Sequence, residues 1–174
     1  MPSQANSLLD FSKRHSALRR QLGVEGLDAW LQPVNDEFQS EYVPAYAARL
    51  PFLNGFSGSA GLAIVAGGTT ASALLVDGRY TLQAPNEIPM EEWEVYNSGE
   101  ITPSAWCGLH LKEGAVIGCD AWLHTHQAVE RLEKQLAAQG QRLKPSLANP
   151  IDVIWADKPV PPESDVLLLP PALT

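Results

Sequence analysis

The stretch Asn54-Gly55-Phe56-Ser57-Gly58-Ser59-Ala60-Gly61 carries three glycines spaced by three, and an apolar run follows it at residues 62–65. A second apolar run, residues 71–76, ends in Asp77-Gly78-Arg79-Tyr80. Glycine tolerates a positive φ and lets another backbone approach closely, so the first stretch predicts a glycine-rich lead into a strand. Gly67-Gly68-Thr69 then predicts a tight turn into an antiparallel return strand.

The second strand ends in a polar corner. Asp77 can accept hydrogen bonds from the amides that follow it, as residues at turns and helix starts commonly do. Arg79 therefore follows a buried element, where a guanidinium can be held in a fixed position.

Helical and strand patterns alternate along the rest of the chain. Hydrophobic spacing and helix-boundary residues predict helices at residues 7–22, 79–84, 103–109 and 125–139, the second of them limited by Pro85. Strands are predicted at residues 27–31, 62–65, 71–76, 93–96 and 115–118, and a further short strand at residues 142–144. Residues 35–46 are polar and predict a loop with a turn of helix. The pattern indicates one α/β domain with a mixed sheet.

Four separated stretches carry a family resemblance. They are Gln39-Ser40-Glu41-Tyr42-Val43-Pro44, residues 49–61, residues 76–84, and the segment Asn149-Pro150-Ile151-Asp152 that continues to Pro159. In this order they resemble the N-terminal domain of aminopeptidase P, an Xaa-Pro aminopeptidase of the creatinase/prolidase family of metallopeptidases. The resemblance implies a single three-layer α/β domain, whose twisted, mixed sheet of about six strands is flanked by helices.

The chemistry of that family lies outside the matched stretches. The resemblance implies two divalent cations, expected to be manganese, held in a C-terminal catalytic domain by two aspartates, one histidine and two glutamates. This chain has no His-Glu-x-x-His, no paired-carboxylate run on a strand and no Gly-x-Ser-x-Gly elbow. We therefore expect residues 1–158 to be a non-catalytic domain with no metal of its own. Residues 159–174, rich in proline, are expected to be a linker to further domains.

Arg79 is the residue to which the resemblance assigns a direct role. In the family, this arginine reaches the cleft and contacts the peptide substrate, and Asp77 and Tyr80 would orient it here. A planar guanidinium can pair with a carboxylate or with peptide carbonyls. The structural alternative is an ion pair with Asp77 or another carboxylate. Arg49 is a weaker candidate that we interpret as structural.

Composition excludes several other classes of function. The 174 residues carry a net charge of −8 with scattered Lys and Arg, which argues against nucleic-acid binding. We expect neither a membrane span nor a signal peptide. Cys107 and Cys119 are interpreted as thiols in a reducing compartment, which places the protein in the cytoplasm. The resemblance implies short peptides with proline at the second position as substrates, and a homodimer.

Other candidate sites have plainer interpretations. His124-Thr125-His126, with Cys119 and Asp120 nearby, could suggest a metal site, but Thr125 as a helix N-cap favours a solvated loop. The spacing of Gly55, Gly58 and Gly61 does not fit a phosphate-binding loop, so we interpret these glycines as structural. Two alternatives remain for the whole chain: the N-terminal domain of a prolidase or creatinase relative, or a stand-alone, non-enzymatic interaction module.

Overall fold

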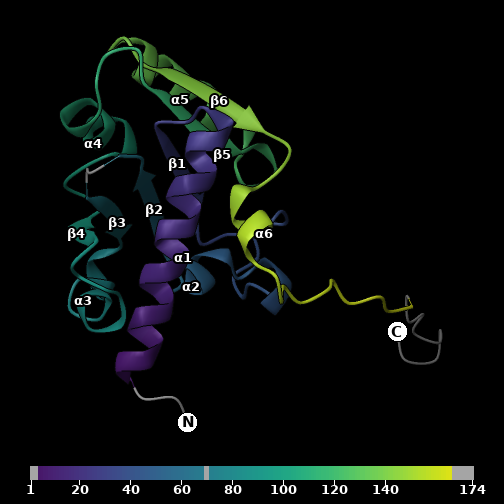
Figure 1. Cartoon of the computed structure of the whole chain (residues 1–174). Coiled ribbons are helices and arrows are strands. Elements are labelled where there is room, and N and C mark those ends of the chain that lie inside the picture. Colours follow the sequence, from purple (N-terminus) through teal and green to yellow (C-terminus); the bar gives the residue numbers. More distant parts are fainter. Residues whose placement is uncertain (1–3, 69–70, 166–174) are drawn as a thin grey trace.

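The fold is built on one mixed sheet, shown in Figure 1 by a computed structural model that describes residues 4–68 and 71–165. The described residues form six strands in the order β4-β3-β2-β1-β5-β6. They are β1 (Ala29–Pro33), β2 (Gly61–Ala66), β3 (Ser72–Val76), β4 (Trp93–Asn97), β5 (Val116–Asp120) and β6 (Arg142–Ser146). β2 runs antiparallel to both β1 and β3, and the other three neighbouring pairs are parallel. The predicted mixed sheet is confirmed.

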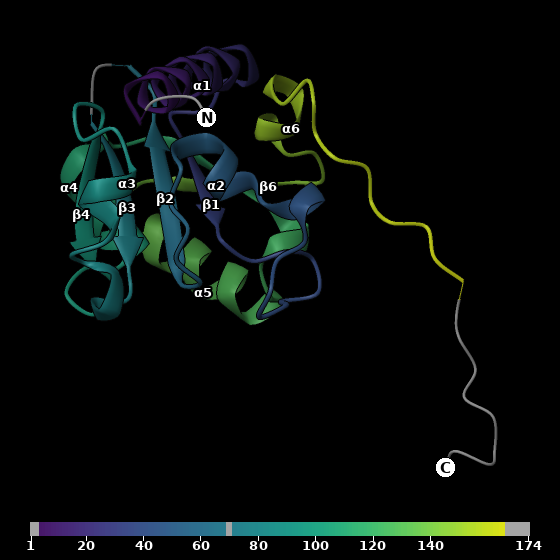
Figure 2. The same cartoon turned by 90° about the horizontal axis from the view of Figure 1, so that it is seen from below.

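Helices cover both faces of the sheet. The α-helices are α1 (Gln4–Glu25), α2 (Arg49–Asn54), α3 (Ala84–Glu87), α4 (Pro103–His110), α5 (His126–Ala137) and α6 (Pro150–Ile154). Short 3-10 turns are η1 (Ala45–Ala47), η2 (Gly78–Tyr80) and η3 (Ala121–Leu123). Figure 2 shows α1, α2 and α6 on one side of the sheet and α5 on the other. This is the three-layer α/β domain expected from the sequence.

The central strands are buried on both faces, which explains their nearly continuous apolar sequence. Trp30 of β1 packs with the residues under α1 and α2, whereas the adjacent Leu31 packs with those under α4 and α5. Val65 and Ile64 of β2 divide between the two sides in the same way. Successive side chains of a strand point to opposite faces, so each run supplies both cores.

The hairpin of β2 and β3 brings the two glycine-containing stretches together. Gly61, at the start of β2, pairs with Val76, at the end of β3. Asp77 follows Val76 directly, and its backbone N–H donates to the carbonyl of Ala60 at 3.4 Å. Residues 54–61 and 77–80 therefore lie next to each other, where β2 begins and β3 ends.

The secondary structure differs from the prediction in two respects. Residues 79–84 are not a helix: η2 ends at Tyr80 and α3 begins at Ala84, with Pro85 inside its first turn. Proline is tolerated there because the first amides of a helix have no intrahelical partner. The helices α2 and α6 were not predicted, since six and five residues are too short to show a helical period.

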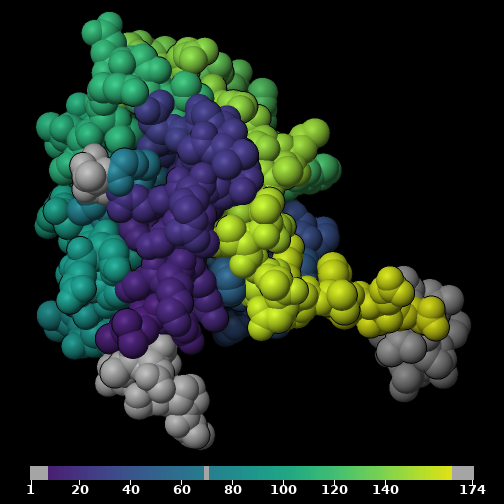
Figure 3. Space-filling model, viewed as in Figure 1, coloured from purple at the N-terminus to yellow at the C-terminus, as the bar shows by residue number. Residues whose placement is uncertain are grey.

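The end of the described chain leaves the domain beside α6. Trp155, just after α6, stacks on Phe52 of α2 with ring centroids 4.4 Å apart. Figure 3 shows the following segment projecting away from the body of the molecule. Residues 155–165 form no helix or strand. The rest of the predicted linker, residues 166–174, lies outside the described residues.

Candidate functional site

The polar corner after β3 holds Arg79 through its neighbour Asp77. One oxygen of Asp77, Oδ1, accepts from the backbone N–H of Arg79 at 3.0 Å and from its Nε at 2.8 Å. The first bond caps the turn η2, and the second fixes the direction of the guanidinium. The ion pair that the sequence suggested is therefore present.

Arg79 is nevertheless mostly open to solvent. Its side chain is 70% exposed and that of Asp77 is 44% exposed. Among the described residues, its two terminal nitrogens have no hydrogen-bond partner. The bonds from the backbone and the side chain of Arg79 lower the pKa of Asp77, and the carboxylate raises the pKa of Arg79. Both groups are charged at neutral pH, and the arginine can bind a further acceptor.

Tyr80 contacts both the Arg79 guanidinium and the glycine-rich stretch at residues 54–61. The guanidinium carbon of Arg79 lies 5.4 Å from the centre of the Tyr80 ring. The Tyr80 hydroxyl is 2.8 Å from the hydroxyl of Ser59, and its ring packs edge-on against Phe56 at 5.7 Å. A Cβ on Gly58 would lie 2.9 Å from Tyr80 Cδ1, so a glycine is needed there. The interpretation of Gly58 as structural is thus supported.

A second set of polar residues braces the same loop, and sequence reasoning missed it. Glu87 of α3 accepts from the Ser57 backbone N–H at 2.9 Å, from the Ser57 hydroxyl at 2.7 Å and from Gln83 Nε2 at 2.8 Å. Burial opposes ionisation of Glu87, but the bonds from Ser57 and Gln83 prevail and lower its pKa. The four-residue spacing of Gln83 and Glu87 was the available signal. The contact with Ser57 spans 30 residues and leaves no local pattern.

Beside this corner lies a mainly apolar hollow of about 330 Å³, lined in part by Gly61, Leu62, Leu75 and Asp77.

Arg49 is structural, as the sequence interpretation held. It is 8% exposed, and its Nε and Nη2 donate to the two carboxylate oxygens of Asp152 at 2.8 and 2.9 Å. Lys158 Nζ donates to the same carboxylate at 2.7 Å. Burial opposes ionisation of Asp152, but these bonds outweigh it and lower its pKa. The pair joins α2 to α6.

The two histidines do not form a metal site. Within residues 4–68 and 71–165, no group of three or more His, Cys, Asp or Glu side chains is arranged to hold a metal ion. Thr125 caps α5 as predicted, accepting from the Ala128 N–H at 3.2 Å. His126 is exposed and lies 3.6 Å from Glu130. His124 is not in a solvated loop: it is largely buried, and burial lowers its pKa.

The two cysteines are buried and unpaired. Burial raises the pKa of both Cys107 and Cys119 to about 12, so neither is a ready nucleophile. None of the described helices has the length and apolar composition needed to cross a membrane.

Comparison with known proteins decides the family. The sequence profile of the creatinase/prolidase N-terminal domain matches residues 14–150. The chain belongs to this family. Aminopeptidase P1 of Lotus japonicus is 39% identical over 160 residues, which cover 90% of this chain and 24% of the plant protein. A probable Xaa-Pro aminopeptidase P of Coprinopsis cinerea is 34% identical over 97% of this chain and 27% of its own length.

Solved structures agree. The X-prolyl aminopeptidase of Caenorhabditis elegans, described as a cytosolic enzyme with a di-nuclear active site, superposes with a TM-score of 0.80 at 31% identity. That match covers 86% of this chain and 26% of the nematode protein. The N-terminal domain of peptidase PepQ from Mycobacterium tuberculosis shares the fold, with a TM-score of 0.62 at 22% identity. This family domain spans about a quarter of the length of the curated relatives it matches.

Proposed function

We propose that this chain is the non-catalytic N-terminal domain of a metal-dependent Xaa-Pro aminopeptidase, where it shapes access of short peptides to the catalytic centre. The family match and the names of the relatives support this. Two divalent cations, expected to be manganese, would be held by the catalytic domain that follows. The described residues offer no ligand set for such a pair, so we assign no step of hydrolysis to them.

A direct role for Arg79 in peptide binding is supported by the way its side chain is held. Its Nε is fixed by Asp77, while the side chain stays 70% exposed with its terminal nitrogens unpaired among the described residues. An arginine held in this way can donate two parallel bonds to a carboxylate, or bonds to main-chain carbonyls, of a bound peptide. In the proposed enzyme, Arg79 contacts a peptide that has proline at its second position, and Asp77 and Tyr80 orient it.

Cellular location and assembly follow from the same proposal. The nematode relative is described as cytosolic, which supports a cytoplasmic protein. A homodimer would let this domain wall off the cleft of its own chain or of a neighbour.

The test is a peptidase assay on the longer protein read from the source gene. With an Xaa-Pro-Xaa tripeptide, Arg79→Ala is expected to lower kcat/KM roughly 10- to 100-fold, the effect of losing hydrogen bonds to a charged group. Metal content should not change, because Arg79 is not a ligand. Arg131→Ala, an exposed arginine on α5, is the matched control and should retain full activity.

Each other result has a definite meaning. Equal kinetics for Arg79→Ala and the unmodified enzyme would refute the role of Arg79. Activity on Xaa-Pro dipeptides alone would indicate a prolidase, and activity on creatine a creatinase. A gene product without a metal-binding domain would indicate a stand-alone interaction module.

A further inference from the structure

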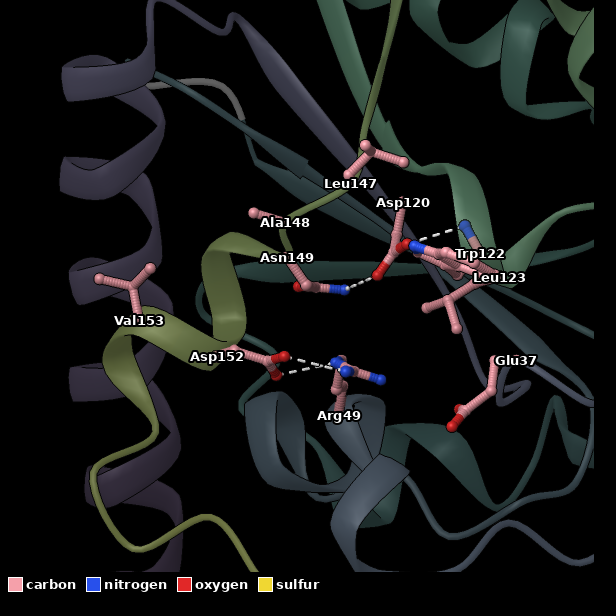
Figure 4. A pocket seen from close by; sticks show the side chains of 10 residues that line it. All are labelled: Glu37, Arg49, Asp120, Trp122, Leu123, Leu147, Ala148, Asn149, Asp152 and Val153. Carbon is pink, nitrogen blue, oxygen red and sulfur yellow. Dashed lines mark hydrogen bonds and ion pairs between the residues drawn. The ribbon is translucent and has the colours of Figure 1, made fainter. Parts of the chain in front are cut away.

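A second pocket, unrelated to Arg79, lies between α2, α6 and the turn after β5 (Figure 4). Its volume is about 560 Å³, which suits a few residues of polypeptide. The polar side chains of Arg49, Asp120, Asn149 and Asp152 line its interior. Apolar side chains surround them.

Arg49 leaves one donor unsatisfied in this pocket. Its Nε and Nη2 bind Asp152, but Nη1 is buried and has no hydrogen-bond partner among the described residues. Figure 4 shows this nitrogen pointing away from Asp152, into the space on the side of Glu37. A buried guanidinium N–H without a partner is strongly unfavourable, and the site therefore calls for an acceptor.

The acceptor that fits is neutral. Three carboxylates, of Glu37, Asp120 and Asp152, line the pocket. Arg49 and Lys158, which both bind Asp152, offset two of these charges, so the balance stays negative and an anion would be repelled. Asp120 is already engaged, since it accepts from the Trp122 backbone N–H at 2.9 Å and from Asn149 Nδ2 at 3.0 Å. A main-chain carbonyl supplies an acceptor without a charge.

The rim of the pocket is apolar and exposed. Trp122 is 65% exposed, Leu147 79% and Val153 64%. An adjoining hollow shares Glu37 with this pocket and is lined by Phe38, Tyr42, Pro161 and Pro162. We call the two together the α6 face. Clustered exposed apolar side chains are typical of protein-binding surfaces.

We propose that the α6 face binds the polypeptide that follows this domain in the full-length protein. One main-chain carbonyl of that polypeptide accepts from Arg49 Nη1, and an apolar side chain packs on Trp122 and Leu147. Two observations select this occupant. The curated relatives are about four times as long as the match, and the chain leaves the domain across this face, where Pro161 and Pro162 line the hollow. The inference rests on the proposed function only in taking the chain as part of a longer peptidase.

The experiment compares hydroxyl-radical oxidation of Trp122 in the 174-residue chain and in the full-length gene product. We expect Trp122 to be oxidised about tenfold more slowly in the longer protein, while buried Trp106 changes in neither. Replacing Arg49 could unfold the domain, so the surface variant is Leu147→Glu. A charge placed against apolar surface is expected to restore rapid oxidation. Leu109→Glu, at a similarly exposed leucine of α4 (75%), is the matched control and should keep Trp122 protected.

Three results would overturn the inference. They are equal oxidation rates in the two proteins, protection that grows with protein concentration and so indicates a second copy, and a gene product that has no following domain. Peptidase activity is measured on the same samples. An active enzyme with unprotected Trp122 would refute the docking and leave the proposed function standing. Protected Trp122 in a product without Xaa-Pro activity would refute the proposed function alone.

Discussion

Arg49 and Arg79 both donate their Nε to an aspartate at 2.8 Å, yet the Arg49 side chain is 10% exposed and the Arg79 side chain 70%. Arg49 binds both oxygens of Asp152, which lies 103 residues away in the sequence. Arg79 binds one oxygen of Asp77, two residues away. The first pair closes the fold, because it ties α2 to α6. The second pair fixes only the direction of a side chain that remains available.

Since the two Nε–Oδ1 distances are equal, the exposure of each ion pair determines how much it contributes to stability. Removing one partner of a buried pair leaves the other charge without compensation in a poorly solvated place. Water and salt screen an exposed pair, so its loss changes stability little. Replacement of Arg49 is therefore expected to reduce the stability of the fold, whereas replacement of Arg79 is expected to reduce binding.

The largest effect is expected for Arg49→Ala. It leaves Asp152 with Lys158 alone and opens a gap between α2 and α6. The free energy of unfolding should fall by about 3 kcal/mol, toward the lower end of values for broken buried pairs because Asp152 keeps one partner. Urea unfolding of the 174-residue chain measures this. Arg79→Ala is the control and should unfold at the same urea concentration as the unmodified chain; equal losses in both variants would erase the distinction.

The next largest effect is expected for Gly58→Ala, which tests whether Tyr80, beside the exposed Arg79, is rigidly packed. The added methyl would meet the ring of Phe56 and lie 2.9 Å from Tyr80 Cδ1. Phe56 is fully buried and cannot move aside, so overpacking should reduce the free energy of unfolding by about 2 kcal/mol. Gly99→Ala, where the nearest atom is the Asn97 side chain at 3.4 Å, is the matched control. An unchanged free energy of unfolding for Gly58→Ala would mean that Phe56 and Tyr80 can shift to accommodate the methyl group.

How much of this could be predicted depends on the reach of each contact. The apolar runs at 62–65 and 71–76 predicted β2 and β3, and the short spacing of Asp77 and Arg79 suggested their pair. The partner of Arg49 could not be predicted, because nothing local links it to Asp152. The helix α6 that carries Asp152 is also too short to show a period. The environment of His15 could not be predicted either, because its partner Ser72 lies 57 residues away in the sequence.

His15 shows how the interior responds to pH while the exposed pair does not. It is 1% exposed; its Nε2 lies 2.8 Å from the Ser72 hydroxyl, and its ring packs against Trp93 at 5.1 Å. Burial, and then the charge of Arg19, lower its pKa from 6.5 to about 4. Below pH 6.5 the unfolded chain takes up a proton that the folded chain refuses, so stability is lost as the pH falls toward 4.

Between pH 7.5 and pH 5.5, the titration of His15 is expected to lower the free energy of unfolding by about 1.4 kcal/mol. Unfolding of the chain at the two pH values measures it. His15→Gln cannot titrate and should show a smaller difference than the unmodified chain. The Asp77–Arg79 pair stays charged throughout, because the pKa of Asp77 lies below its ordinary value of 3.8. Equal pH responses for His15→Gln and the unmodified chain would show that His15 is not the source.

The smallest effect is expected for Asp77→Asn, which separates geometry from charge at the exposed corner. An asparagine Oδ1 can still accept from the backbone N–H and the Nε of Arg79, and asparagine is a good N-cap, so the turn η2 should persist. The unfolding midpoint should not move, in contrast to Asp152→Asn, which leaves Arg49 buried without its counter-charge. In the full-length enzyme, Asp77→Asn is expected to lower kcat/KM only about two- to fivefold, less than Arg79→Ala, because the guanidinium keeps its direction and loses only a screened attraction. A loss as large as that of Arg79→Ala would mean that the carboxylate of Asp77 itself takes part in binding, and the exposed corner would then be a two-residue site.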